Sequence, residues 1–173
     1  MVTHDQEEAM TMANRLAVMS EGQIVQLGTP HQVYGYPNSR FSAQFIGSTN
    51  LFDGHVVEDE PDYVFVESAD LPVRLYVSHG ITGPLGMPMT ISVPPERIAL
   101  TRKPPEGTFN WGHGKISNIA YTDGYPLYHV TLDSGKVVVA NLSSLAIGKI
   151  DSPTFGDEVY VQWSASASVV LTS

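Results

Sequence analysis

From about residue 50 onward, apolar and polar residues alternate with a period of two. The segments with this pattern are YVFVE, VRLYV, MTISV, RIALT, YHVTL, KVVVAN, EVYVQW and SVVLT. Turns rich in Pro, Gly and Asp separate them, for example HGITGPLGMP, RKPPEG and LDSGK. A period of two sends alternate side chains to opposite faces of a strand, so each segment predicts a short strand with one buried face. Many short strands at this spacing predict a mainly β fold, an OB-like small barrel or sandwich.

The first fifty residues have a different pattern, which predicts helices. Residues 3–14 are typical of a short helix, because Thr3 can act as N-cap with Gln6 three positions later as its capping-box partner. Acidic residues follow at once, where the positive end of the helix dipole favours them.

A hairpin and two more short helices are predicted next. RLAVMSEGQIVQLGT reads as two strands that turn around residues 20–22. Thr29-Pro30, with Gln32 as the third helical residue, predicts the start of a helix. A third helix is expected to begin near Ser39 and to end at Gly47.

The chain is therefore expected to divide in two. Residues 1–50 form a short α+β piece that is too small to hold an independent core, so we expect it to be part of something larger. Residues 51–173 form the β domain.

Composition excludes several classes of function. The chain has eighteen acidic and nine basic residues among 173, a formal net charge of −9, which opposes binding to nucleic acid or to an anionic membrane. It has no cysteine, so disulfides, thiolate metal sites and cysteine nucleophiles are excluded. No apolar run is long enough for a membrane helix and no secretion signal is visible, so a soluble cytoplasmic protein is expected.

No motif predicts metal or nucleotide chemistry within the chain. Its histidines are dispersed without the spacing of metal ligands: His4, His31, His55, His79, His113 and His129. GITGPLG and WGHGKI contain glycines but lack the pattern of a phosphate-binding loop. The acidic run 58–62 is expected to be a solvated hairpin turn, and Trp111 and Trp163 are expected to pack in the barrel rather than to stack on bases.

The sequence also resembles a known protein family, and the resemblance begins at Thr3-His4-Asp5. The opening VTHDQEEAMTMANRLAVMSEGQIVQLGTPHQVYGYP resembles the switch-histidine segment of ABC-transporter ATPases and the elements that follow it. RFSAQFIGSTNLF then resembles the exit into the C-terminal region of importer ATPases. SVPPERIAL, GKISNIAYTDGYPLYHVTLDSGKVVVANL and FGDEVYVQWSASASVVLTS resemble the transport-associated OB (TOBE) module of these subunits, most closely those of polyamine (putrescine or spermidine) importers. Pro94 stands where that family usually has an arginine.

The resemblance implies a role for His4. In the family this histidine contacts the γ-phosphate of ATP, and the full-length subunit binds ATP and Mg²⁺. The phosphate-binding lysine, the magnesium ligands and the signature loop of the family have no counterpart in this chain. We therefore expect that the isolated chain needs no cofactor and is not catalytic, although the parent resembles a polyamine-transporting ATPase.

The resemblance also implies partners and a location. We expect a homodimer formed through residues 51–173. Through the parent subunit, the partners would be two membrane-spanning permease subunits and a periplasmic polyamine-binding protein. The location would be the cytoplasmic face of the bacterial inner membrane, and the β domain would regulate the ATPase or stabilise its dimer.

Two alternatives remain open from the sequence. The β domain can be a stand-alone module that binds a small oxyanion or a polyamine, or the parent can serve a sugar or inorganic-ion importer. Basic residues near turns would hold an oxyanion, namely Arg97, Arg102, Lys103 and Lys115. The net charge favours a cation instead, with carboxylates and aromatic rings as its partners. Nucleic-acid binding by the barrel is not expected, because the chain lacks basic residues interleaved with exposed aromatics.

Overall fold

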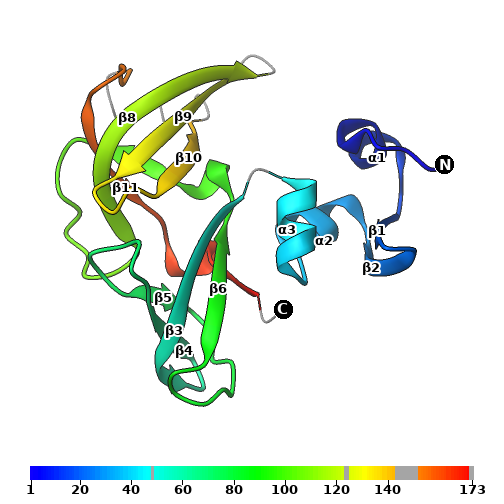
Figure 1. Ribbon diagram of the computed structural model, residues 1–173, viewed down its shortest axis with the longest axis horizontal. Helices are drawn as coiled ribbons and strands as arrows, with labels where there is room; N and C mark the ends of the chain where they lie inside the picture. The colour runs from blue at the N-terminus through cyan, green and yellow to red at the C-terminus, as the bar shows by residue number, and fades with distance from the viewer. Residues whose placement is uncertain (48, 123–124, 143–151, 172–173) are drawn as a thin grey trace.

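The computed structural model describes residues 1–47, 49–122, 125–142 and 152–171. The main body is built from two five-stranded antiparallel sheets, each curled into a half-barrel (Figure 1). The sequence-based prediction of a mainly β, OB-like fold is thereby confirmed.

The ten strands of the two sheets fall into two consecutive sets of five. The first set consists of β3 (Asn50–Glu60), β4 (Tyr63–Glu67), β5 (Leu75–Val77), β6 (Pro88–Val93) and β7 (Ala99–Thr101). The second set consists of β8 (Trp111–Thr122), β9 (Tyr125–Leu132), β10 (Val137–Asn141), β11 (Glu158–Gln162) and β12 (Val169–Leu171). A single 3₁₀ turn precedes the last strand of each set, η1 (Pro95–Arg97) before β7 and η2 (Ala165–Ala167) before β12.

The two sets are structural repeats that exchange their last strands. One sheet has the order β5-β4-β3-β6-β12 and the other the order β10-β9-β8-β11-β7. Each repeat therefore builds four strands of its own sheet and receives the fifth strand from the other repeat. Neither repeat can complete its sheet alone, so the two are interlocked.

The repeats agree in detail as well as in topology. The long first strands are interrupted by a β-bulge after Val56 in β3 and after Ile116 in β8. At each bulge the carbonyl accepts a hydrogen bond from a turn glycine, Gly86 N–H at 2.7 Å and Gly156 N–H at 2.8 Å. These glycines have φ angles of +83° and +86°, in the left-handed region that favours glycine. The bulges let β3 and β8 run longer than the short strands predicted from the sequence, because a bulge bends a strand around the barrel.

Two buried asparagines tie the repeats together. Asn50, at the start of β3, accepts from Val139 N–H at 2.7 Å and donates to Val139 C=O at 2.8 Å, so its side chain pairs with the free edge of β10. Asn110, just before β8, makes the same two bonds to Tyr76 in β5, at 2.8 and 2.9 Å. Each amide thus satisfies backbone groups at the edge of the other repeat. Asn110 also has a φ angle of +57°, which asparagine tolerates better than most residues.

One hydrophobic core lies between the sheets and draws on both repeats. Phe52 from β3 stacks on Trp163, which follows β11, with ring centroids 5.1 Å apart. Trp163 is therefore a core residue, as the sequence predicted, whereas Trp111 is only partly buried and donates its indole N–H to Gly107 C=O at 3.0 Å. Fully buried members of the core include Val56, Val64, Leu75, Ile91, Ile116, Val130, Val138 and Val161.

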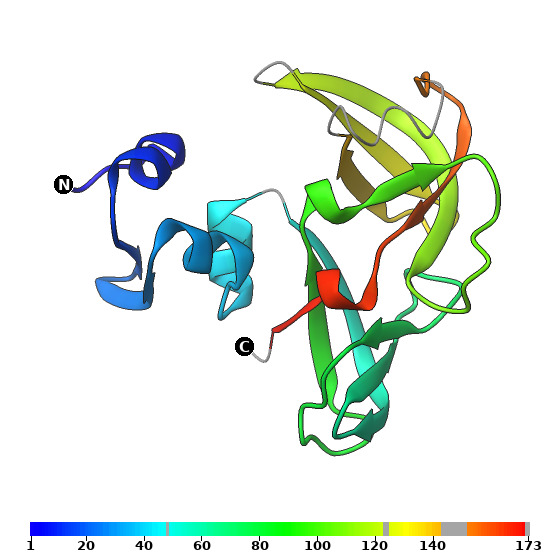
Figure 2. The same cartoon turned by 180° about the vertical axis from the view of Figure 1, so that it is seen from behind.

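The N-terminal elements lie to one side of the barrel (Figures 1 and 2). They are α1 (Gln6–Met12), β1 (Leu16–Ser20), β2 (Gln23–Gly28), α2 (Pro30–Gly35) and α3 (Arg40–Ile46). The hairpin β1–β2 and all three helices were predicted. The proposed division of the chain into domains after residue 50 stays a prediction.

The caps of the helices agree with the sequence in two cases and differ in one. Thr29 and Gln32 form the predicted capping box of α2, and Ser39 caps α3. The prediction of Thr3 as N-cap of the first helix was wrong. Asp5 is the N-cap, accepting from Glu8 N–H at 3.0 Å, because its carboxylate competes well for the free N–H groups of the first turn.

Replacing either asparagine of the inter-repeat pairs should destabilise the whole barrel. We expect Asn50→Ala and Asn110→Ala each to lower the free energy of unfolding by about 1–3 kcal/mol, because each substitution leaves buried backbone N–H and C=O groups without hydrogen-bond partners. Urea denaturation measures this change. The exposed Asn118 offers a matched control, and Asn118→Ala should change stability by less than about 0.5 kcal/mol. Equal effects of all three substitutions would contradict the role given to the buried pair.

Candidate functional site

The predicted site residue, His4, lies at the exposed N-terminal end of the chain. It immediately precedes the N-cap of α1, and its side chain is exposed. Its neighbour Thr3 accepts from Asp5 N–H and donates to Glu8 at 2.9 Å. These local bonds fix the entry into α1 but leave the imidazole facing solvent. The role of His4 in ATP chemistry remains a prediction.

Several polar side chains connect the helices α2 and α3 to the barrel. We call this contact region the joint. Arg40, the first residue of α3, makes two hydrogen bonds to the carboxylate of Asp53 in β3, at 2.6 and 3.2 Å. Thr90 in β6 donates to the same carboxylate at 2.7 Å. The hydrogen bonds from Arg40 and Thr90 lower the pKa of Asp53, since both favour the ionised form. A bidentate arginine–carboxylate pair of this kind fixes the relative orientation of the two side chains as well as their distance.

A second link runs from α2 to the 3₁₀ turn η1. The hydroxyl of Tyr34 donates to Glu96 at 3.1 Å. Burial of the ring, followed by the charge of Glu96 and this hydrogen bond, raises the pKa of Tyr34 to about 12. The phenol therefore stays protonated and able to donate throughout the physiological range.

Apolar contacts close the joint between these two links. Ala43 of α3 packs with Leu51 of β3 and with Leu171 of β12, and Val169 packs against them. The last strand of the chain is thus part of the surface on which α3 lies. This contact joins the helices to both repeats, because β3 belongs to the first and β12 to the second.

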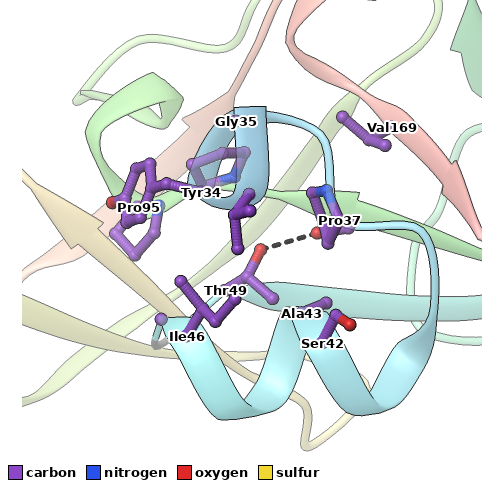
Figure 3. A pocket seen from close by; sticks show the side chains of 13 residues that line it. Tyr34, Gly35, Pro37, Ser42, Ala43, Ile46, Thr49, Pro95 and Val169 are labelled. Atoms are coloured by element: carbon purple, nitrogen blue, oxygen red, sulfur yellow. Dashed lines mark hydrogen bonds between the residues drawn. The ribbon is translucent and has the colours of Figure 1, made fainter. Parts of the chain in front are cut away.

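A small cavity of about 20 Å³ lies inside the joint (Figure 3). The hydroxyls of Thr49 and Ser92 lie at its wall, 2.7 Å apart, and the dashed line that starts at Thr49 in Figure 3 marks this hydrogen bond. The space is enough for one water molecule and too small for a nucleotide or an organic ligand. Pro94 and Pro95 also line it, so both prolines lie at the contact between helices and barrel.

A second, more open cavity of about 230 Å³ lies where the connection after β4 meets β8 and the end of β9. His113 and Asp133 are hydrogen-bonded to each other at its edge, with Nδ1 and Oδ2 2.8 Å apart. Asp70, which also lines it, lies 3.6 Å from Lys136 Nζ and accepts from Ser134 through its backbone carbonyl. Both carboxylates that line this cavity therefore already have partners, Asp133 in His113 and Asp70 in Lys136.

Two of the basic residues considered for an oxyanion, Arg102 and Lys115, lie beside carboxylates. Arg102 donates to Asp157 at 3.1 Å. Lys115 lies opposite Glu158 in the register of β8 and β11. Among the residues that the structure describes, no group of three or more His, Asp or Glu side chains is arranged to hold a metal ion.

The acidic run 58–62 forms the predicted β3–β4 hairpin, but Asp59 has a role that the sequence did not reveal. Its carboxylate accepts from Ile81 N–H at 3.0 Å and from Gly83 N–H at 2.9 Å. These backbone hydrogen bonds lower the pKa of Asp59. They hold a loop in which Thr82 has a φ of +56°, an uncommon conformation for a β-branched residue. Asp59 therefore organises a loop that periodicity alone leaves undefined.

Comparison with known proteins agrees with this architecture. Residues 91–171 match the TOBE domain family. The chain is 41% identical over 172 residues to the putrescine transport ATP-binding protein PotG of Escherichia coli K12, covering 99% of the chain and 46% of that protein. It is 38% identical to the spermidine/putrescine import ATP-binding protein PotA of Thermotoga maritima (98% and 47% covered) and 35% identical to PotA of Nostoc (99% and 44%).

The chain matches the C-terminal, TOBE-domain portion of polyamine-importer ATP-binding subunits. This confirms the resemblance seen in the sequence. The chain spans less than half the length of each of these relatives.

The barrel is also similar to a solved structure of the cytoplasmic molybdate-binding protein ModG. The TM-score is 0.60 over 72% of this chain and 96% of that one, with 14% sequence identity. At this identity the likeness concerns the fold alone. Within the described residues, no helix is both long and apolar enough to cross a membrane.

The tyrosine of the joint gives a direct test of the link between α2 and the TOBE domain. We expect the Tyr34 phenol to titrate near 12, and its pKa to fall toward the ordinary value in Glu96→Gln while staying raised by burial. NMR of tyrosines labelled with ¹³C at Cζ measures this, with Tyr34→Phe to assign the signal. Because ionisation breaks the link, stability that Tyr34 provides below pH 10 should be lost as the pH rises toward 12. An unchanged Tyr34 titration in Glu96→Gln would contradict the link.

Proposed function

We propose that this chain is the regulatory part of an ATP-binding subunit that energises polyamine import, with putrescine as the transported substrate. The observation that carries the proposal is the 41% identity to a putrescine transport ATP-binding protein along 99% of the chain. The joint supports it, since a regulatory domain must be attached firmly to the part that it regulates.

The chemistry of the joint suits such attachment. The Arg40–Asp53 pair and the Tyr34–Glu96 hydrogen bond fix α3 and α2 to the barrel at two separate points. The apolar contact of Ala43 with Leu51 and Leu171 adds a third attachment of α3 to the barrel. A displacement of the helices would therefore be passed to the barrel as a rigid movement rather than absorbed by a flexible linker.

In the complete subunit His4 would contribute to an ATP and magnesium site. An imidazole N–H can donate to a γ-phosphate oxygen as negative charge develops there. Within this chain His4 is the one residue that the resemblance assigns to such a site, and its exposure leaves it accessible to a nucleotide held by other residues. The isolated chain would then neither bind ATP tightly nor hydrolyse it.

The partners follow from the same proposal. The subunit would work as a homodimer with two membrane-spanning permease subunits and a periplasmic polyamine-binding protein, at the cytoplasmic face of the inner membrane. Symmetric pairs are the commonest assemblies of soluble proteins, and the barrel would provide the contact between the two subunits.

Reconstituted transport tests the substrate. The complete subunit that carries this sequence, placed with its permease subunits and binding protein in vesicles, should drive ATP-dependent uptake of labelled putrescine. Uptake of a sugar or an inorganic ion in its place would contradict the proposal. His4→Ala should reduce uptake by roughly two orders of magnitude if the imidazole stabilises the transition state, while Asn118→Ala should leave it unchanged.

The isolated chain provides two further tests. Light scattering at tens of micromolar should give the mass of two chains, and a mass of one chain would count against dimerisation through residues 51–173. Calorimetry with ATP should show no binding at micromolar concentration. Micromolar affinity together with hydrolysis that is lost in His4→Ala would show that the chain holds a complete site.

A further inference from the structure

An aromatic layer covers the outer face of β4 and β5. Four partly exposed rings pack on one another there, with centroids 4.7–6.3 Å apart. We call this surface the aromatic face, and it consists of Tyr63, Phe65, Tyr76 and Phe109. On the same strands Val64, Val66, Leu75 and Val77 point the other way, into the core.

The repeat shows that the fold does not require these rings. Strand registers place Phe65 opposite Glu58 in the first repeat and His129 opposite Asn118 in the second, so Phe65 corresponds to His129. By the same register Tyr63 corresponds to Leu127. The asparagine pairs make Tyr76 correspond to Val139. The second repeat builds the same strands with one imidazole and aliphatic side chains where the first has three aromatic rings.

Carboxylates surround the aromatic face. Glu58 accepts from the Tyr63 hydroxyl at 2.6 Å, and Glu60 lies opposite Tyr63 across the hairpin. Glu67, at the far end of β4, lies 3.5 Å from the imidazole of His55. Arg74 is exposed two positions before Tyr76, so the carboxylates outnumber the cations beside these rings.

Aromatic rings with carboxylates at their edges suit a guanidinium or ammonium group. A cation stacks on the negative face of a ring, while a neighbouring carboxylate accepts its N–H groups. Arginine is expected to bind best to such a surface, because its planar guanidinium can stack on a ring and at the same time make a bidentate pair with a carboxylate. The hydrogen bond from Tyr63 raises its pKa to about 12 and keeps the phenol neutral beside Glu58.

The shape of the surface favours a protein over a small amine. Neither cavity described above includes any of the four rings, which form an open layer on a sheet. A small ligand needs a concave site that buries most of its surface, whereas protein interfaces are often flat and rich in Tyr, Phe and Arg. A second copy of this chain placed on the aromatic face would bring Glu58, Glu60 and Glu67 against the same carboxylates, so the proposed dimer contact is expected elsewhere on the barrel.

We propose that the aromatic face is a docking surface for an arginine-bearing segment of a partner protein. The proposal goes beyond polyamine import and does not depend on the transported substrate. It requires only that the rings and the carboxylates of this face act together.

The test uses the full chain and a fluorescent peptide of about eight arginines at about 0.15 M salt. The Tyr63→Leu/Tyr76→Val double variant introduces the residues that the second repeat carries at the same positions, so it should fold. Fluorescence anisotropy should show that this variant binds the peptide roughly tenfold more weakly, because two cation–π contacts are lost. Glu60→Gln should also weaken binding, and Tyr121→Leu, at a tyrosine that is 81% exposed elsewhere, should not.

An octa-lysine peptide separates stacking from simple charge attraction. The wild-type chain should bind it more weakly than the arginine peptide, and the double variant should lose this preference. Equal affinity of wild-type and double variant for both peptides, with unchanged circular dichroism, would overturn the proposal. Displacement of the peptide by millimolar putrescine would also overturn the proposal, because it would assign the face to a small amine. A dimer that becomes monomeric in the double variant would overturn it too, because it would assign the face to a second copy.

Discussion

The exchange of β7 and β12 between the two repeats is the constraint on which the rest of this structure depends. Each five-stranded sheet is complete only when the other repeat has folded, so the barrel has one core and not two. The amides of Asn50 and Asn110 complete the exchange, because each pairs with a strand edge that the exchanged strands leave open. Phe52 and Trp163 then stack across the boundary, so both repeats share this aromatic contact of the core.

Much of this architecture could be predicted from the sequence, because its signals are local. Alternation with a period of two identified the strands, and Thr29 with Gln32 identified the capping box of α2. The order of motifs from His4 to the β region identified the importer family. Thr3 was misjudged because Thr3 and Asp5 are both good N-caps, and the choice depends on backbone geometry that spacing does not fix.

The repeat and its asparagine pairs were not predicted, for physical reasons. A period-two pattern says which face of a strand is buried but not which strand lies beside it. Asparagine is common in turns, so Asn50 and Asn110 look like ordinary loop residues until their partners 89 and 34 positions away are known. The joint is equally non-local, since Tyr34 and Glu96 are separated by 62 positions. Residues such as Leu127 and Tyr63 correspond in space without resembling each other in sequence.

The position of β12 has a mechanical consequence. This strand is the last described element of the chain, yet it pairs with β6 of the first repeat and lies against the cluster that holds α3. A movement of β12 would therefore act directly on the surface that α3 contacts. The first and the last strands of the barrel, β3 and β12, therefore meet at the one cluster that also holds α3.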